Sequence, residues 1–420
     1  MRALVRQSRA SGHVRAPGSK SYSIRAAVCA AMADGESVLE SVLEADDTAA
    51  VLECVAALGA KVARAVDGLH VHGGALRATD AELWCRESAA TLRFLMGLAA
   101  TIPGATTFRC ATSLARRPVM PLVDAIRQLG AACDVDSATG TVTVVGVPAG
   151  NGRVRLRGDV SSQFLSALLL SGPRYDGGLE IELDTPLVSE RYVMMTMECM
   201  RAFGADVRAS ADARSFNVQP GGYSPQRYVV EGDWSGAAAL LALGALAGDV
   251  TVTGLNRSSL QADTAIADLL RDMNVNLTGS GEELRVRRSR LKAVLADLSG
   301  AIDLLPVAAA LGAAAGGVTT LTGVARAREK ESDRVAAMAE GLQRMGVAVE
   351  VGDNHLSVHG GVAGGAVVSS AGDHRIAMAF GALGAAVGDI VVEGAECVSK
   401  TYPEFWTDLQ CLGVEVQLGE

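Results

Sequence analysis

The chain has 420 residues, 49% hydrophobic and 20% charged, so we expect two or three folded domains, each with a sizeable core. Its formal net charge of −9 argues against nucleic acid or an anionic membrane surface as the main partner, because both need an excess of basic residues. The longest apolar runs are too short to span a bilayer and no apolar leader is present, so we expect a cytoplasmic protein.

The first informative stretch lies between Pro17 and Arg25, at the start of an Ala-rich segment that predicts a helix. It brings Lys20, Arg25 and three serine hydroxyls together at the helix start. Unpaired backbone N–H groups and the helix dipole favour an anion at such a position, so a phosphate or carboxylate is the expected ligand. The alternative is an ordinary capped helix start with both cations in solvent.

A similar arrangement recurs along the chain. At six places a helix-like segment ends in an apolar residue and is followed by a residue suited to a helix C-cap, namely Gly59, Gly130, Gly204, Asn274, Gly346 and Gly413. Intervals of 67 to 74 residues indicate a repeated unit with room for two helices and several strands. An earlier, Ala/Leu-rich helix is expected in each repeat, starting at Ser19, Ser88, Ser161, Trp234, Ile302 and His374. Alternating runs such as 69–72 and 142–145 predict strands, so each repeat is βαβαββ-like, with three repeats per domain and a linker near 221–227.

Charged and hydroxyl side chains gather at the starts of these helices and in the loops before the second helix of each repeat. If equivalent ends of the repeats face one another across two domains, these groups line one cleft that binds a small, multiply anionic substrate. The alternative for each group is a helix cap or a local ion pair: Glu331 and Arg334, for example, are three residues apart, a spacing at which helical side chains meet.

Several of these motifs, in order and over nearly the whole chain, resemble the 5-enolpyruvylshikimate-3-phosphate (EPSP) synthase family. They are Pro-Gly-Ser-Lys-Ser at 17–21 with Arg25, Arg117-Pro118, Ser-Ser-Gln-Phe at 161–164, Lys-Glu-Ser-Asp-Arg at 330–334, Asp373-His374-Arg375 with Met378, and Lys400. The resemblance implies an α/β enolpyruvyl transferase-like fold of six βαβαββ units, three in each of two domains, with the active site in the interdomain cleft. It places residues 20–226 in one domain and residues 1–19 with 227–420 in the other.

The implied reaction transfers the enolpyruvyl group of phosphoenolpyruvate to the 5-hydroxyl of shikimate 3-phosphate and releases phosphate through a tetrahedral adduct. Neither a metal nor an organic cofactor is implied, and a monomer is expected. By resemblance, the phosphoenolpyruvate contacts are Lys20, Arg93, Arg117, Arg334, Arg375 and Lys400. The shikimate 3-phosphate contacts are Ser21, Arg25, Ser161, Ser162, Gln163, Ser189, Tyr192 and Lys330. Asp303 resembles the base near the 5-hydroxyl, and Glu331 with Lys400 the proton-handling pair at the methylene carbon; Lys20 completes the catalytic set.

The sequence departs from the family pattern before Arg93. The usual Gly and Thr of that loop are Ala89 and Ala90 here. In the family the Gly lets the backbone approach the phosphoenolpyruvate phosphate, and a methyl there crowds glyphosate, so the resemblance predicts a glyphosate-tolerant enzyme. Arg326 stands where the family usually has Asn, and together these changes leave open a paralogue with another acceptor.

The main rival is the sister enolpyruvyl transferase that acts on UDP-N-acetylglucosamine, which carries a reactive cysteine shortly before an Arg-Pro-Val. Cys110 lies eight residues before Pro118, but the Ser-Ser-Gln-Phe and Lys-Glu-Ser-Asp-Arg motifs belong to the shikimate branch, so we interpret Cys110 as structural.

A P-loop is excluded because Gly does not directly precede Lys20. His70 and His72 share a strand face but lack a third metal ligand, and the eight scattered cysteines form no CxxC pair. A non-catalytic anion-binding protein has no need of Asp303 and Glu331.

Overall fold

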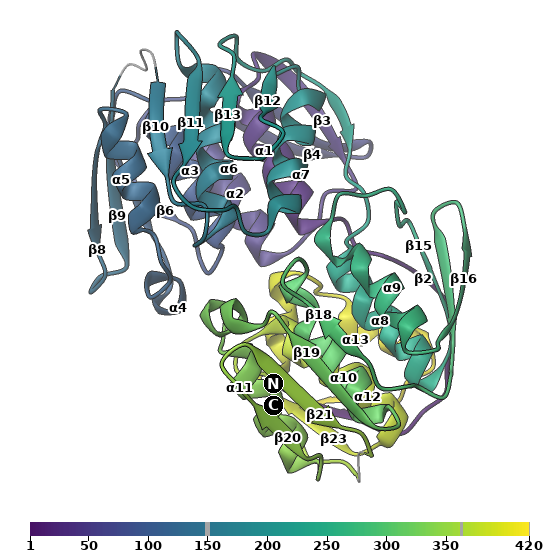
Figure 1. The fold of residues 1–420 in the computed structure, drawn as a ribbon. Helices are drawn as coiled ribbons and strands as arrows, with labels where there is room; N and C mark the ends of the chain where they lie inside the picture. The colour runs from purple at the N-terminus through teal and green to yellow at the C-terminus, as the bar shows by residue number, and fades with distance from the viewer. Residues whose placement is uncertain (148–151, 362–363, 420) are drawn as a thin grey trace. The chain divides into compact units, whose positions relative to one another are not determined.

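The computed structural model describes residues 1–147, 152–361 and 364–419, and the chain divides into two compact units. Unit I is Gly18–Val230, and unit II combines Met1–Pro17 with Glu231–Glu420 (Figure 1). The crossings expected from the sequence follow residues 19 and 226, and those between the two compact units follow residues 17 and 230. The second crossing lies later because β14 (Arg227–Val229) pairs in parallel with β3 (Gly35–Glu40) and so belongs to unit I. A strand of three residues is too short for its pattern to be recognised.

Both units alternate helices and strands. The helices of unit I are α1 (Lys20–Met32), α2 (Asp46–Ala57), α3 (Ala89–Ala99), α4 (Thr112–Ala115), α5 (Met120–Gln128), α6 (Ser162–Ser171) and α7 (Glu190–Ala202). Its strands, besides β3 and β14, are β4 (Lys61–Ala65), β5 (Gly68–Gly73), β6 (Leu83–Trp84), β7 (Gly104–Arg109), β8 (Ala132–Asp136), β9 (Thr141–Gly146), β10 (Gly152–Leu156), β11 (Leu179–Leu183), β12 (Val207–Ala209) and β13 (Ser215–Val218).

Unit II begins with β1 (Arg2–Val5) and β2 (Ala10–Arg15). Its helices are α8 (Trp234–Ala247), α9 (Ile266–Asp272), α10 (Leu305–Ala314), α11 (Arg334–Arg344), α12 (His374–Val387) and α13 (Phe405–Cys411). The remaining strands are β15 (Gly248–Thr253), β16 (Asn276–Ser280), β17 (Glu283–Arg287), β18 (Leu295–Asp297), β19 (Val318–Thr322), β20 (Val349–Val351), β21 (His355–His359), β22 (Val367–Ser369), β23 (Ile390–Glu393) and β24 (Val416–Gly419).

Among the described residues the strands form six four-stranded sheets, all with one pattern. In the sheet β6-β7-β9-β8, the first pair is parallel and the other two pairs are antiparallel. The helices α3 and α5 connect its strands into a βαβαββ repeat. The sheets β10-β11-β13-β12 and β18-β19-β21-β20 repeat this arrangement. The predicted fold class, six such repeats with three in each unit, is therefore confirmed.

The other three sheets each take a strand from a distant part of the chain. β14 supplies the first position beside β3, and β2 supplies it beside β15. β1 lies between β23 and β24, so that Arg2 is opposite both Glu393 and Gly419. The purple N-terminal strand β2 lies with the green strands of unit II in Figure 1.

The predicted C-cap residues end the second helix of each repeat. Gly59, Gly130, Gly204, Gly346 and Gly413 all have positive φ, and Asn274 has φ of 64°. A left-handed residue at this point lets the chain leave the helix and start the hairpin. The regular spacing of these Gly and Asn residues in the sequence therefore reflects the helix ends of the six repeats.

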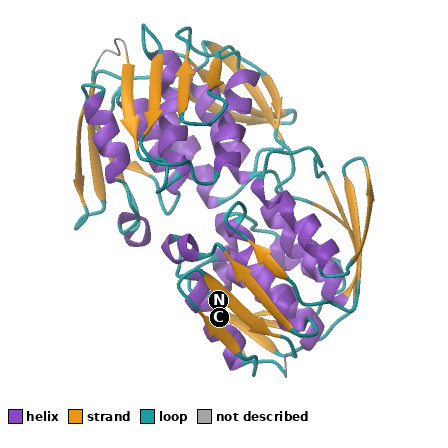
Figure 2. Ribbon diagram, in the orientation of Figure 1, coloured by secondary structure: helices purple, strands orange, loops and turns teal. Residues whose placement is uncertain are grey.

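The Ala/Leu-rich helices pack together within each unit and the strands flank them (Figure 2). In unit II, all residues of α8 except Ser235 are buried. In unit I, a Cβ added at Gly97 of α3 would lie 2.6 Å from the carbonyl oxygen of Ala167 on α6, so glycine permits the close approach of these helices. No helix in the described part of the chain is long and apolar enough to cross a membrane.

Candidate functional site

Three helices of unit I begin with the same kind of cap. The serine side chains accept hydrogen bonds from backbone N–H groups: Ser19 from Tyr22, Ser88 from Thr91 and Ser161 from Gln163. The first turns of α1 and α6 carry the predicted residues Lys20, Ser21, Ser162 and Gln163. Helix starts provide N–H donors and a partial positive charge, so this arrangement favours anions.

Arg25 is held rigidly between α1, α3 and α7. Its guanidinium, in a residue only 2% exposed, donates to Thr196 Oγ1 (2.8 Å), the Ser21 carbonyl (2.8 Å) and the Tyr192 carbonyl (3.1 Å). It also lies 5.1 Å from the centre of the Phe94 ring. These partners are neutral, and burial lowers the pKa of Arg25 from its usual value. The structure thus links three predicted residues, Ser21, Arg25 and Tyr192.

Arg93 connects two other predicted motifs. It donates to Gln163 Oε1 (2.7 Å), to Ser161 Oγ (3.3 Å) and to the carbonyl of Pro118 (2.6 Å). Its guanidinium also stacks on Phe164, 4.8 Å from the ring centre. A single buried side chain therefore holds the start of α6 against the loop that carries Arg117.

The remaining predicted residues of unit I lie at neighbouring helix ends. The Lys20 ammonium forms an ion pair with Asp47 at 3.0 Å, and both side chains are mostly buried. Ser189 caps α7 in a left-handed conformation, and its carbonyl accepts from the Tyr192 N–H at 3.1 Å. Arg117 is half-buried.

Ala89 and Ala90 form the first turn of α3. Ala89 is 5% exposed and belongs to the apolar core of unit I, whereas Ala90 is half-buried and packs against that core. The departure from the family pattern thus lies at the start of the helix that carries Arg93.

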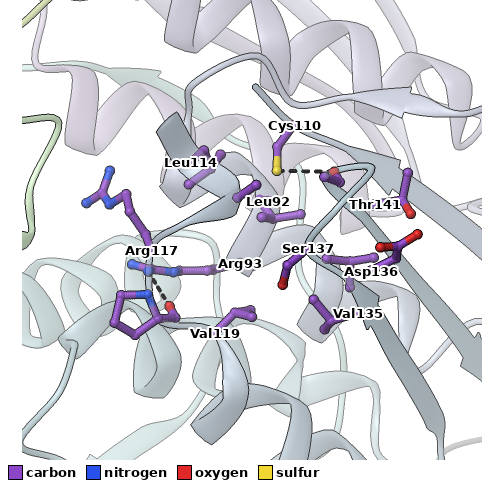
Figure 3. Close-up of a pocket in the computed structure, with 14 residues that line it drawn as sticks. Leu92, Arg93, Cys110, Leu114, Arg117, Val119, Val135, Asp136, Ser137 and Thr141 are labelled. Carbon is purple, nitrogen blue, oxygen red and sulfur yellow. Dashed lines mark hydrogen bonds between the residues drawn. The ribbon is translucent and has the colours of Figure 1, made fainter. Parts of the chain in front are cut away.

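A small open pocket lies beside Arg93 and Arg117 (Figure 3). Its lining is mostly apolar and includes Leu92, Leu114 and Val135, and the turn between β8 and β9 closes one side. Of the predicted binding residues of unit I, Arg93 and Arg117 are the ones that line it. Such walls suit an apolar group better than a phosphate.

Cys110 also lines this pocket but has the character of a structural thiol. It is 6% exposed, and its Sγ donates to the Gly140 carbonyl at 3.3 Å. Figure 3 draws this bond as a dashed line from the Cys110 sulfur. Burial raises the pKa of the thiol. A reactive cysteine needs the opposite shift, because the thiolate is the nucleophile.

In unit II, Arg334 is the centre of the candidate site. Its guanidinium is bonded to Asp303 Oδ1 (2.6 Å), Glu331 Oε2 (2.7 Å) and Asp373 Oδ2 (2.7 Å), and the side chain is 1% exposed. The three carboxylates outweigh burial and raise the pKa of Arg334 well above its usual value. The ion pair with Glu331 is the local one that the spacing predicted. The bonds to Asp303 and Asp373 come from other elements, so Arg334 does more than pair locally.

Asp303 lies in a short 3₁₀ helix, Ile302–Leu304, just before α10. Besides Arg334, it faces the Lys330 ammonium at 3.3 Å and the Arg375 guanidinium at 3.4 Å. Burial alone would raise the pKa of Asp303, but the three cations outweigh it and hold the pKa well below its usual value. The carboxylate is therefore ionised at neutral pH.

Arg375 and Lys400 complete the set at the start of α12. Asp373 caps this helix and accepts from the Arg375 backbone N–H at 2.9 Å. The Lys400 ammonium donates to the carbonyl of Gly372 at 2.8 Å. Unit II thus brings together all of its predicted site residues, Asp303, Lys330, Glu331, Arg334, Arg375 and Lys400.

Sequence reasoning missed three residues that hold the predicted ones in place. Asp373 was visible as part of a motif, but its cap on α12 and its bond to Arg334 were not. Thr196 and Asp263, which contacts Arg375 at 3.4 Å, carry no local signal because their partners lie 112 or more residues away. Arg326, flagged as a departure, donates to the Ser299 carbonyl at 2.8 Å.

Comparisons with known proteins agree on one family. A family model described as EPSP synthase (3-phosphoshikimate 1-carboxyvinyltransferase) matches residues 5–409. A 3-phosphoshikimate 1-carboxyvinyltransferase from Dehalococcoides mccartyi strain 195 is 40% identical to this chain, with 99% of each chain covered. One from Methanocorpusculum labreanum is 39% identical, covering 99% of this chain and 100% of the relative.

Solved structures show the same likeness. An EPSP synthase from Acinetobacter baumannii has a TM-score of 0.84 at 26% identity, covering 99% of this chain and 100% of that one. The enolpyruvyl transferase NikO from Streptomyces tendae has a TM-score of 0.79 at 20% identity, covering 99% of this chain and 98% of that one, which is a likeness of fold alone.

Proposed function

We propose that this chain, which belongs to the EPSP synthase (3-phosphoshikimate 1-carboxyvinyltransferase) family, transfers the enolpyruvyl group of phosphoenolpyruvate to the 5-hydroxyl of shikimate 3-phosphate. The observation that carries this proposal is the Arg334 centre, which holds Asp303 and Glu331 within reach of one guanidinium. These are the two carboxylates that the chemistry needs, one for the hydroxyl proton and one for the methylene carbon.

The reaction proceeds by addition and then elimination. Asp303 accepts the proton of the 5-hydroxyl as its oxygen bonds to C2 of phosphoenolpyruvate, and the pair Glu331 and Lys400 delivers a proton to the methylene carbon. In the second step this pair removes a proton from the resulting methyl group, the C2–O bond to phosphate breaks, and the proton held by Asp303 passes to the departing phosphate. Each positioned proton-transfer group contributes about 10²–10⁴ in rate.

The ligand-free pKa of Asp303 bears on this role. A carboxylate stabilised by Lys330, Arg334 and Arg375 is a weak base. Bound phosphate and carboxylate groups share these cations, so substrate binding returns the pKa of Asp303 toward its usual value. Asp303 therefore becomes a stronger base when the anionic substrates bind.

The binding roles divide between two sets of residues. The first set binds shikimate 3-phosphate. It consists of Ser21, Arg25, Ser161, Ser162, Gln163, Ser189 and Tyr192 of unit I and Lys330 of unit II. The second set binds phosphoenolpyruvate. It consists of Lys20, Arg93 and Arg117 of unit I and Arg375 and Lys400 of unit II. Arg334 was predicted to join the second group. Its bonds to three carboxylates support a role in holding the acids in place, and the direct contact stays a prediction.

A coupled assay of phosphate release tests the proposal. Shikimate 3-phosphate and phosphoenolpyruvate are supplied together, with UDP-N-acetylglucosamine as the competing acceptor. We expect turnover that depends on shikimate 3-phosphate and is unaffected by the nucleotide sugar. Turnover with the nucleotide sugar alone would instead assign the chain to the sister reaction, which the buried thiol of Cys110 disfavours.

Three narrower predictions concern the setting of the enzyme. The substitutions at Ala89 and Ala90 predict tolerance of glyphosate, which the same assay measures when the inhibitor is added. A monomeric state is tested by light scattering of the purified protein. The cytoplasmic location is tested by fractionation of the source cells.

A further inference from the structure

Asp263 is a buried carboxylate that the reaction scheme above does not use. It lies in the 3₁₀ helix Ala262–Ala265 and is 1% exposed. Its Oδ2 accepts from Ser235 Oγ at 2.5 Å and faces the Arg375 guanidinium at 3.4 Å. Its Oδ1 is buried without a hydrogen-bond partner among the described residues.

The burial of the Asp263 carboxylate is energetically unfavourable, so a purely structural role does not explain it. A buried carboxylate is costly unless both oxygens are satisfied. No backbone N–H in the described part of the chain bonds to the Asp263 side chain, so it does not cap its helix. The feature that remains is its contact with Arg375.

Arg375 is held by two carboxylates rather than one. Nη1 faces Asp263 and Nη2 faces Asp303, each at 3.4 Å. Both separations exceed the usual hydrogen-bond range, in contrast to the bonds of 2.6 to 2.7 Å around Arg334. Asp263 and Asp303 thus orient the Arg375 guanidinium from two sides.

We propose that Asp263 is a positioning residue for phosphoenolpyruvate binding, which acts by holding the Arg375 guanidinium through Nη1. This inference rests on the proposed function, because it takes Arg375 as a phosphoenolpyruvate contact. Removal of the Asp263 charge takes away a carboxylate that orients Arg375, so we expect weaker binding of phosphoenolpyruvate.

The charge of Asp263 depends on pH, so its contact with Arg375 should depend on pH as well. Burial raises the pKa of Asp263 to about 6, against the lowering effects of Arg375 and of the Ser235 hydrogen bond; the nearby carboxylates of Asp303 and Asp233 raise it further. Asp263 therefore takes up a proton as the pH falls through about 6 and releases its hold on Arg375. Removing the Ser235 hydroxyl removes a lowering effect, so this change moves to higher pH.

The test compares Asp263→Asn, Ser235→Ala and a matched control, Asp249→Asn. Asp249 pairs with Arg285 at 2.7 Å on the surface of the same unit. We expect Asp263→Asn to raise the KM for phosphoenolpyruvate about tenfold, the equivalent of one modest charge-assisted contact, with a smaller change in the KM for shikimate 3-phosphate. The control leaves both constants unchanged.

The pH profile distinguishes positioning from a structural role. The ratio of variant to wild-type kcat/KM cancels the titration of the substrate phosphates. For Asp263→Asn this ratio should rise toward one below pH 6, and for Ser235→Ala the acid decline should begin at higher pH. A variant with the wild-type KM for phosphoenolpyruvate, or a ratio independent of pH, would overturn the proposal.

A second readout separates this inference from the proposed function. Protection from thermal unfolding by phosphoenolpyruvate is measured on the same proteins without an acceptor. Absence of turnover in the wild type would refute the proposed function. Equal protection of wild type and Asp263→Asn would refute the role of Asp263, whatever the reaction.

Discussion

Arg334 shows how one buried side chain brings together carboxylates that lie apart in the sequence, two of which the proposed reaction uses. Its three nitrogens each meet a different carboxylate, on the 3₁₀ helix before α10, on the loop before α11 and at the cap of α12. Removing one partner of a buried ion pair costs about 3–5 kcal/mol, because the other charge is left uncompensated. The same contacts that support unit II therefore set the geometry of its acids.

Asp303→Asn should retain substrate binding and lose most turnover. The amide keeps the shape of the side chain but cannot accept the hydroxyl proton, so we expect kcat to fall by about 10²–10⁴. Calorimetry should show that shikimate 3-phosphate still binds, and Asp249→Asn serves as the control. An unchanged kcat would remove Asp303 from its role as base.

Ala89→Gly should make the enzyme more sensitive to glyphosate. If the Ala89 methyl narrows the inhibitor site, its removal strengthens inhibition by about tenfold or more, the usual range for one methyl group in a pocket. Ala99→Gly, at the other end of α3, controls for the loss of helix stability. Equal inhibition of wild type and Ala89→Gly would mean that the methyl serves only the apolar core in which it is buried.

The helices of unit I are joined by polar contacts as well as by apolar packing. Arg25 on α1 donates to Thr196 on α7, whose Oγ1 lies 2.8 Å from Ser166 Oγ on α6. All three residues are buried. Because an unmade hydrogen bond in such a place is expensive, this contact fixes how the three helices meet.

Thr196→Val should therefore destabilise the protein and weaken binding of shikimate 3-phosphate. Loss of a hydrogen bond to a charged group costs about 1.5–3 kcal/mol, measured by urea unfolding. Thr106→Val is the matched control, because its buried hydroxyl has no hydrogen-bond partner among the described residues. The control should be neutral or stabilising. A smaller loss for Thr196→Val than for Thr106→Val would contradict this account.

Each unit of the molecule is completed by strands from distant parts of the chain. In unit I the last strand, β14, closes the sheet of the first repeat; in unit II the N-terminal strands β1 and β2 join sheets of the sixth and fourth repeats. The three sheets of unit I nevertheless all lie within Gly18–Val230.

A fragment of residues 18–230 should thus fold alone, and one of residues 18–226 should be less stable. The shorter fragment loses the ladder between β14 and β3 and the hydrogen bond from the Val230 N–H to the Glu40 carbonyl. Thermal unfolding followed by circular dichroism compares them. Arg227→Ala in the longer fragment separates the effect of the Arg227–Glu40 ion pair from that of the ladder. Identical midpoints for the two fragments would place the boundary at 226.

Much of the fold and site could be predicted because it depends on local chemistry. The six C-cap residues mark the period, since a left-handed helix end needs Gly or Asn, and the serine caps mark the starts of α1, α3 and α6. The motif residues of both units were identified in advance. Their roles followed from family resemblance, because neighbours in sequence do not reveal what a side chain meets in the fold.

Contacts between distant residues could not be predicted from one sequence. Three such contacts join residues that share no periodic pattern. They are the pairing of Arg2 with Gly419, the pairing of β14 with β3 and the contact of Asp263 with Arg375. Helix caps and hydrophobic spacing act over a few residues, so the sequence determines them directly. Strand exchange and buried ion pairs depend on which surfaces meet after the chain has folded, and only the tertiary structure decides that.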